Sequence, residues 1–188
     1  MNTINPIVLK NMPGSDIRWK NFKGQVTERN QYGIRQFALF LDPEQVDING
    51  LIAEGWKVKE RVYDGTDKPT EYYLNVDLNY NYQEPPIIDL VIDDGEAIPH
   101  GSHITEDTVA ELDDTVFTRF DIVVRPRWTK NKFSGQWSLK AMLRRLIVWS
   151  EPNYYKAALE DFDDMLADVI FDDTDEQVLD EIEDNEEE

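Results

Sequence analysis

Residues 125–137, RPRWTKNKFSGQW, combine two kinds of side chain that together favour one kind of chemistry. The segment contains no acid, and its cations and rings are Arg125, Arg127, Trp128, Lys130, Lys132, Phe133 and Trp137. An unpaired polynucleotide presents a line of phosphate charge and a series of flat bases. Lysine and arginine follow the phosphates, and an aromatic ring stacks on any base for about 1–3 kcal/mol. The segment is therefore typical of single-stranded nucleic-acid binding without sequence preference.

Two other segments, residues 18–35 and 56–61, repeat this combination of cations and rings. Adjacent strands of a small barrel would bring all three segments into one groove. The candidate binding residues are Trp19, Lys20, Phe22, Lys23, Arg35, Lys57, Lys59, Arg125, Arg127, Trp128, Lys130, Lys132 and Phe133.

The opposing interpretation is that rings on strands belong to the core and that the cations are merely solvated. It stays open for the candidate rings taken singly, and burial is a real alternative for Trp19, Trp56, Trp137 and Trp149. Trp128 and Phe133 flank a cationic turn, so we expect them at the surface.

Charge is divided unevenly along the 188 residues, whose formal net charge is −20. Residues 151–188 carry a net charge of −16, with 17 acids against Lys156, and residues 1–150 carry −4. Residues 119–145 nevertheless hold eight cations and a single acid, Asp121. A basic segment followed by a strongly acidic one predicts a binding domain over residues 1–150 and an acidic tail over residues 151–188.

The elements that must position these residues are mainly strands. Alternation and β-branched or aromatic content predict strands over residues 34–41, 56–64 and 69–82, with residues 85–93 as the partner of the last. Residues 117–128 and 135–149 predict a final hairpin, with Pro126 at an edge or a bulge. We therefore expect a mainly β fold, a small OB-like barrel.

One or two short helices complete the predicted domain. Asp42 is a candidate N-cap for a helix that Gly55 ends. Residues 104–114, with Thr105 as cap, predict a second. In the acidic tail, apolar residues at three- and four-residue steps predict an amphipathic helix, and residues 174–188 are too acidic and too poor in apolar residues to fold.

The sequence favours no enzyme. It has no phosphate-cradling glycine loop and no nucleophile–base arrangement. His100 and His103 lie near Asp93, Asp94 and Glu96, but their spacing fits no standard metal site. We therefore predict neither a metal nor another cofactor, and a nuclease built on the Asp93–Asp94 pair is a remote alternative.

Composition also bears on location. No apolar run approaches the roughly 20 residues that a membrane-spanning helix needs, so no membrane association is expected. The chain has no cysteine, which is compatible with a reducing cytoplasm, where we expect the protein.

Taken in order, several segments of residues 15–150 resemble a group of bacteriophage single-stranded-DNA-binding proteins. The resemblance rests on NFKGQVTERNQYGIRQFALFLD, GWKVKE, a tyrosine-rich strand, PPIIDLVIDDG, ITEDTVAELDD and DIVVRPRWTKNKFSGQWSLKAMLRRLIV, followed by an acidic tail. It implies an OB-type barrel, a role in DNA replication or recombination, and the cytoplasm of the host cell. The chain departs from many single-strand binders in its last residues, EDNEEE, which lack an aromatic tip.

The acidic tail suggests regulation and partners. A tethered acidic segment has a high effective concentration near a cationic groove, so it would compete with DNA, and it could recruit replication or recombination proteins. A tail that only aids solubility is the simpler alternative, and the sequence leaves homo-oligomers open. An acidic interaction protein, such as a DNA mimic or a virion component, remains the alternative function, although a mimic has no use for the basic segment.

Overall fold

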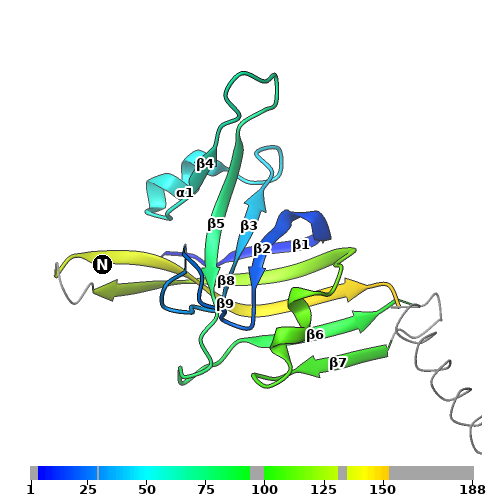
Figure 1. The fold of residues 1–188 in the computed structure, drawn as a ribbon. Helices are drawn as coiled ribbons and strands as arrows, with labels where there is room; N and C mark the ends of the chain where they lie inside the picture. The colour runs from blue at the N-terminus through cyan, green and yellow to red at the C-terminus, as the bar shows by residue number, and fades with distance from the viewer. Residues whose placement is uncertain (1–3, 29, 94–99, 131–134, 153–188) are drawn as a thin grey trace, which may run out of the picture. The chain divides into compact units, whose positions relative to one another are not determined.

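The computed structural model describes residues 4–28, 30–93, 100–130 and 135–152. The chain divides into two units, Met1–Glu151 and Pro152–Glu188, and the elements that the structure describes belong to the first (Figure 1). In chain order they are β1 (Ile7–Pro13), η1 (Gly14–Asp16), β2 (Ile17–Asn21), β3 (Gln36–Leu41), α1 (Ile48–Glu54), β4 (Lys59–Arg61), β5 (Glu71–Asp77), β6 (Ile87–Ile92), β7 (His100–Ile104), η2 (Val109–Asp113), β8 (Arg119–Lys130) and β9 (Trp137–Ser150). The helix and the unfolded end that the acidic tail predicts lie outside the described residues.

The strands form one sheet that curls back on itself. Hydrogen-bonded neighbours follow the order β1-β8-β9-β5-β3-β2, and β1 continues into β2 through the single turn η1. One bent stretch of chain thus pairs with β8 on one side and with β3 on the other. Counting β1 and β2 as one bent strand, this is the five-stranded order of an OB barrel, with the β5–β9 pair parallel. The prediction of a mainly β, OB-like fold is confirmed.

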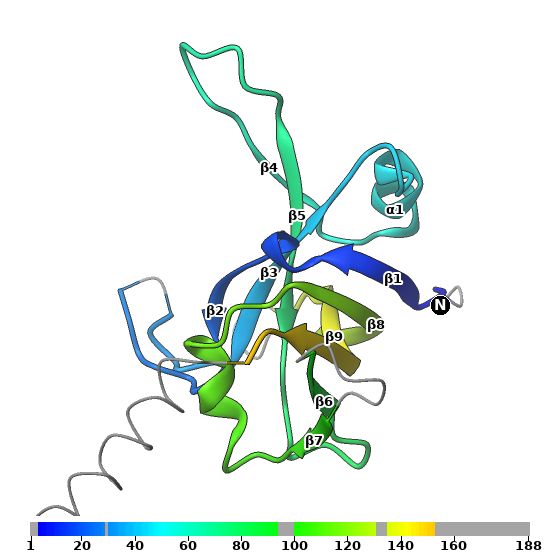
Figure 2. The ribbon, with the colours of Figure 1, turned by 90° about the vertical axis from the view of Figure 1, so that its right-hand side faces the viewer.

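The barrel is only partly closed. The parallel contact between β5 and β9 covers two residue pairs, Val76–Ala141 and Asp77–Met142. The antiparallel β8–β9 hairpin is much longer, pairs along the whole of β8, and extends away from the barrel (Figures 1 and 2). β6 and β7 widen the sheet on the other edge of β9.

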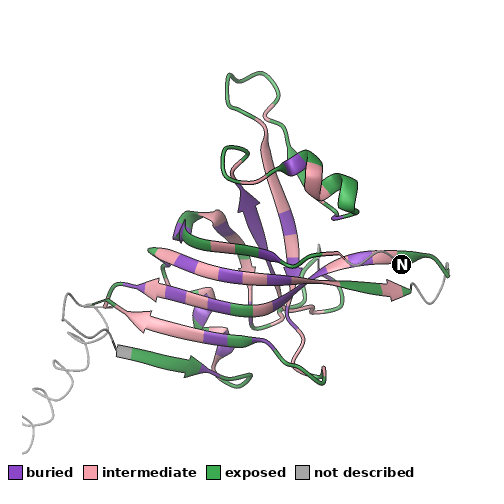
Figure 3. Ribbon diagram, turned by 180° about the vertical axis from the view of Figure 1, so that it is seen from behind, coloured by how far each residue is buried: buried purple, intermediate pink, exposed green. Residues whose placement is uncertain are grey.

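The core fills the inside of the curled sheet. Buried and less buried positions alternate along β8 and β9, as Figure 3 shows from behind. Phe37, Leu39 and Leu41 of β3 point inward. Val109 and Leu112 of η2, both fully buried, add to this core.

Both predicted short helices differ in extent from the prediction. α1 begins after Asp47, whose side chain accepts a hydrogen bond from the Gly50 amide, and Asp42 lies in a preceding turn. Gly55 ends the helix as predicted, with φ 100°. Within the predicted helix 104–114, only Val109–Asp113 is helical, and it forms the 3₁₀ turn η2 rather than an α-helix. Its two core residues are three apart, which matches the three-residue period of that helix.

The pairing of β5 also differs from the prediction. Residues 85–93 do form a strand, β6, but it pairs with β7 and β9. Both edges of β5 are already occupied, one by β3 and the other by β4 and β9. The same sharing limits β4 to three residues instead of the nine predicted.

The final hairpin is confirmed with shifted ends. Beyond Val124, β8 has β9 on one side and no described strand on the other. Pro126 lies on this free edge, where its missing N–H costs no ladder bond. In the described part of the chain, no helix is long and apolar enough to cross a membrane.

Gly14 permits the bend between β1 and β2. It is buried, and its amide donates to the Thr118 carbonyl at 3.0 Å. A Cβ at this position would lie 1.9 Å from the Phe117 carbonyl oxygen. The backbones at Gly14 and Phe117 are both held by neighbouring hydrogen bonds, so moving either one away would cost free energy.

We therefore expect Gly14→Ala to lower the free energy of unfolding by about 3 kcal/mol or more, measured by urea denaturation. Gly101→Ala is the matched control, because its Cβ would meet only the Leu90 carbonyl oxygen at 3.9 Å. Equal unfolding midpoints for the two variants would contradict this account of the bend.

Candidate nucleic-acid interface

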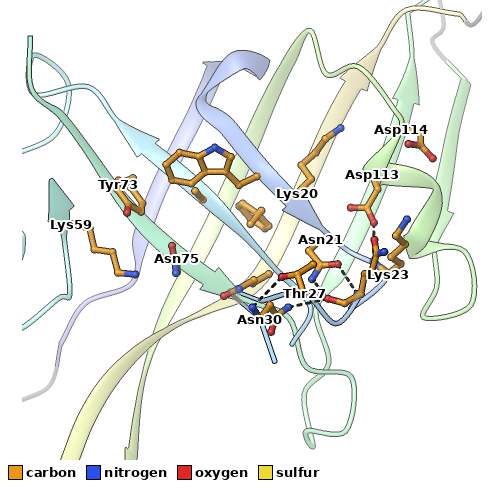
Figure 4. Close-up of a pocket in the computed structure, with 15 residues that line it drawn as sticks. Lys20, Asn21, Lys23, Thr27, Asn30, Lys59, Tyr73, Asn75, Asp113 and Asp114 are labelled. Atoms are coloured by element: carbon orange, nitrogen blue, oxygen red, sulfur yellow. Dashed lines mark hydrogen bonds between the residues drawn. The ribbon is translucent and has the colours of Figure 1, made fainter. Parts of the chain in front are cut away.

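Two adjoining hollows lie on the outer face of β2, β3 and β5, and Figure 4 shows the larger (about 670 Å³; the smaller is about 300 Å³). They share Gln36, Lys59 and Asn75, so we treat them as one outer groove. The strand register places Gln36 opposite Asp77 and Ala38 opposite Asn75, on the face turned away from the core. The groove thus runs along the outside of the barrel.

Three rings form an outer aromatic cluster in the groove: Trp19, Phe40 and Tyr73. Phe40 and Tyr73 lie opposite each other in the β3–β5 register and stack with ring centroids 5.3 Å apart. Trp19 meets both edge-on, at 5.3 and 5.1 Å. Phe40 is buried, but Trp19 is 53% exposed. Phe40 and Tyr73 therefore form a packed base that supports the exposed ring of Trp19.

A β-bulge turns Trp19 outward. Between Arg18 and Asn21 the register of β2 advances three residues while β3 advances two. Trp19 adopts φ 51°, a left-handed conformation that costs a non-glycine residue of order 1–3 kcal/mol. Bulges recur where a side chain must be re-aimed near a functional site.

Cations surround the cluster. The Arg18 guanidinium lies 4.0 Å from the Phe40 ring centroid, and Arg61 lies 5.4 Å from that of Trp19. Lys59 extends over Tyr73 at 5.8 Å and has no acidic partner among the described residues. Lys59 is thus a positive charge beside flat rings, available to a phosphate.

Two asparagines hold the loop between β2 and β3 in shape. Asn21 accepts from the Gln25 amide at 2.7 Å and donates back to the Gln25 carbonyl at 2.9 Å. Asn30, which is buried, makes the same two-way contact with Ile34, at 2.9 and 2.7 Å. The side-chain amides thus replace strand pairing across the loop, which forms one wall of the groove (Figure 4).

Some predicted cations serve the fold. Lys20 donates to the Leu112 carbonyl at 2.9 Å and to the Thr115 carbonyl, and burial lowers the pKa of its ammonium group despite the nearby Asp113. Arg35 pairs with Glu106. Neither residue is free to follow a phosphate chain without first breaking these contacts.

Arg125 and Arg127 join the β8–β9 hairpin to the segment that connects β5 with β6. Arg125 donates to the Glu84 carboxylate at 2.8 Å and to its carbonyl at 2.7 Å. The Arg127 guanidinium lies 3.5 Å from the Tyr82 ring centroid. These contacts lie on one face of the hairpin and fix its direction.

The other face of the hairpin carries two exposed tryptophans, and both faces reach the smaller hollow, this one through Leu139 and the first through Lys140. Trp128 pairs with Leu139 and Lys130 with Trp137, so these four share a face. Leu139 also lines the smaller hollow. Trp128 and Trp137 are 39% and 54% exposed, so we call this the tryptophan face.

The structure places the predicted residues in four positions. Trp19, Lys20, Lys23, Lys57 and Lys59 line the outer groove. Trp128 and Lys130 lie on the tryptophan face, and Arg35, Arg125 and Arg127 are engaged by the contacts above. Lys132 and Phe133 lie outside the described residues.

The selection of Phe22 needs correction. Phe22 is fully buried and stacks on Phe37 with ring centroids 5.4 Å apart, so it offers no face to a ligand. The alternative of burial holds for Trp56, which is buried. The alternative of burial is wrong for Trp19 and Trp137, both of which are exposed.

Sequence reasoning missed Gln36, Tyr73 and Asn75 as groove residues, and it left Trp137 out of the candidate binding residues. The alternation of 72–78 contained a signal, because Tyr73 and Asn75 occupy the positions between the apolar ones. Nothing in the sequence shows which outer face other elements cover.

The loop near the two histidines forms no metal site in the described part of the chain, where no three His, Asp or Glu side chains are suitably grouped. His103 Nδ1 lies 3.1 Å from Asp89. Asp94 and Glu96 lie outside the described residues.

Comparison with known proteins identifies the family. A family model described as "Putative phage ssDNA-binding domain" matches residues 2–187. A solved structure, "Single-stranded DNA-binding protein from bacteriophage Enc34, C-terminal truncation", superposes with a TM-score of 0.46 and 13% identity, over 77% of this chain and 86% of that chain. No curated protein sequence matches significantly. The match along nearly the whole chain shows that this protein belongs to the phage single-stranded-DNA-binding domain family.

Proposed function

We propose that the outer groove and the tryptophan face bind single-stranded DNA without sequence preference. The observation that carries the proposal is the exposed Trp19, supported by Phe40 and Tyr73 and flanked by the free charge of Lys59. Rings and cations on adjacent strands match the two features that every unpaired strand presents. The family to which the chain belongs supports the same ligand.

The position on the barrel also supports the proposal. In OB folds, oligonucleotides bind across the second and third strands and the loops that follow the first and fourth. Here those parts are β3, β5, the loop over residues 22–35 and the end of the β8–β9 hairpin. The proposed path of the single-stranded DNA runs from Trp19 past Lys59 and Asn75 to Lys57 and then to the tryptophan face.

In the cell, this activity protects displaced strands during phage DNA replication or recombination, in the host cytoplasm. The protein binds rather than transforms its ligand, consistent with a family described by binding. The net charge of −16 on residues 151–188 supports a regulatory tail that competes with DNA for the cations and recruits replication or recombination proteins.

Removal of single rings tests the stacking. Trp19→Ala and Trp137→Ala should each cost about 1–3 kcal/mol of binding, because one base loses its stacking partner. The slope of log affinity against log salt should stay unchanged, because no cation is lost. Fluorescence anisotropy of a labelled oligothymidine over a salt series measures both quantities.

Tyr32→Ala is the control for these two variants. It removes a ring that is 86% exposed and lies outside the groove lining. If Trp19→Ala and Tyr32→Ala bind alike, the aromatic cluster has no part in binding.

Substitution of single cations separates free charges from those that serve the fold. Lys59→Gln and Lys130→Gln should each flatten the salt slope by about 0.7, the value for one phosphate contact on a single strand. Arg125→Gln removes the same charge but should leave the slope unchanged, because Glu84 already holds that guanidinium. If Arg125→Gln flattens the slope and the two lysine variants do not, the assignment of free and engaged charges is wrong.

Deletion of residues 151–188 tests the tail. Loss of its net charge of −16 should tighten DNA binding, most clearly at low salt, where electrostatic competition is strongest. The same anisotropy titration at two salt concentrations measures the change. Unchanged or weaker affinity would leave the tail without a role in binding.

A further inference from the structure

Glu71, the first residue of β5, holds side chains from three parts of the chain. Its Oε1 accepts from Arg18 of β2 at 2.9 Å, and its Oε2 accepts from the Tyr63 hydroxyl at 2.6 Å. Arg61 of β4 approaches Oε2 at 3.9 Å. Both carboxylate oxygens are therefore engaged at the end of the outer groove.

The partners of Glu71 lie against the outer aromatic cluster. The Arg18 guanidinium packs over Phe40 and also donates from Nε to the Ser15 carbonyl at 2.9 Å. Arg61 lies between two rings, 5.4 Å from the centroid of Trp19 and 4.7 Å from that of Tyr63. The hydrogen bonds and the ion pair of the carboxylate thus reach Phe40 and Trp19 through Arg18 and Arg61.

The ionised form of the carboxylate is favoured by these contacts. The hydrogen bond from Tyr63, followed by those with Arg18, lowers the pKa of Glu71. The same bond raises the pKa of the Tyr63 hydroxyl, which therefore remains a donor at neutral pH.

We infer that Glu71 is a positioning residue for DNA binding: it holds Arg18 and Arg61 against the outer aromatic cluster and so orders Trp19 before a base arrives. The inference rests on the proposed function. A ring that is already ordered loses less conformational freedom on binding. Trp19 has particular need of such support, because its backbone is strained at the bulge.

The inference predicts a change in DNA affinity opposite to the one that simple electrostatics predicts. Removing an acid from the end of a cationic groove should strengthen the attraction for phosphate and release two arginines. If Glu71 positions the cluster, its removal weakens binding instead. The direction of the change alone separates the two explanations.

The test compares Glu71→Gln with Glu60→Gln in the full chain, using labelled oligothymidine at moderate salt. Glu60 lies on β4, is exposed, and pairs opposite Tyr72 rather than with the cluster. Both variants remove one negative charge from neighbouring strands. We expect Glu71→Gln to weaken binding roughly three- to tenfold, while Glu60→Gln leaves it unchanged or slightly tighter.

A double-mutant cycle with Trp19→Ala shows whether Glu71 acts through the ring. In the Trp19→Ala background, Glu71→Gln should have no further effect, because the side chain it positions is gone. Tyr63→Phe, which removes one hydrogen-bond donor, should weaken binding in the same direction but less. This milder variant keeps the test valid if Glu71→Gln reduces folding.

Each outcome has one meaning. Equal or tighter binding by Glu71→Gln relative to Glu60→Gln overturns the positioning role, and so does an undiminished loss in the Trp19→Ala background. If Trp19→Ala itself binds like the unaltered protein, the proposed groove is wrong and the inference fails with it. If the unaltered protein does not bind the oligonucleotide, the proposed function fails.

Discussion

The bend at Gly14 is the constraint on which the rest of the structure depends. It lets one stretch of chain pair with β8 before the turn and with β3 after it. A flat sheet would leave β1 and β2 as two open edges, whereas the bend joins them and encloses the core. With the apolar side chains enclosed, the outer face of β2, β3 and β5 is available for other chemistry.

That outer face is unusual because part of it is buried without belonging to the core. Ala38 and Phe40 of β3 are both nearly inaccessible, although they point away from the inside of the barrel. Phe40 is covered by Trp19, Tyr73 and Arg18, and these covering groups lie toward solvent. Under the proposed function, packing and binding thus use the same rings, with one side against the protein and the other toward solvent.

The sequence predicted the kinds of element and most of their positions, because alternation of apolar residues marks strands that cover a core. It did not predict the pairing of β5: β6 has the pattern of a partner for β5, but both edges of β5 are occupied by β3, β4 and β9. It also could not distinguish free cations from engaged ones. Lys20 and Lys23 are equivalent in the sequence, yet only Lys20 donates its side chain to two carbonyls. Such differences come from tertiary contacts between residues about 90 positions apart.

The two-pair contact between β5 and β9 has a mechanical consequence. The smaller hollow of the groove adjoins this seam, whereas the long β8–β9 ladder holds the barrel together elsewhere. Separating two residue pairs and the Lys140–Asp77 ion pair beside them costs far less than unfolding the core, so this seam can open while the rest of the barrel remains folded. Purines and pyrimidines differ in width, and under the proposed function a compliant seam of this kind admits both without a dedicated pocket for either.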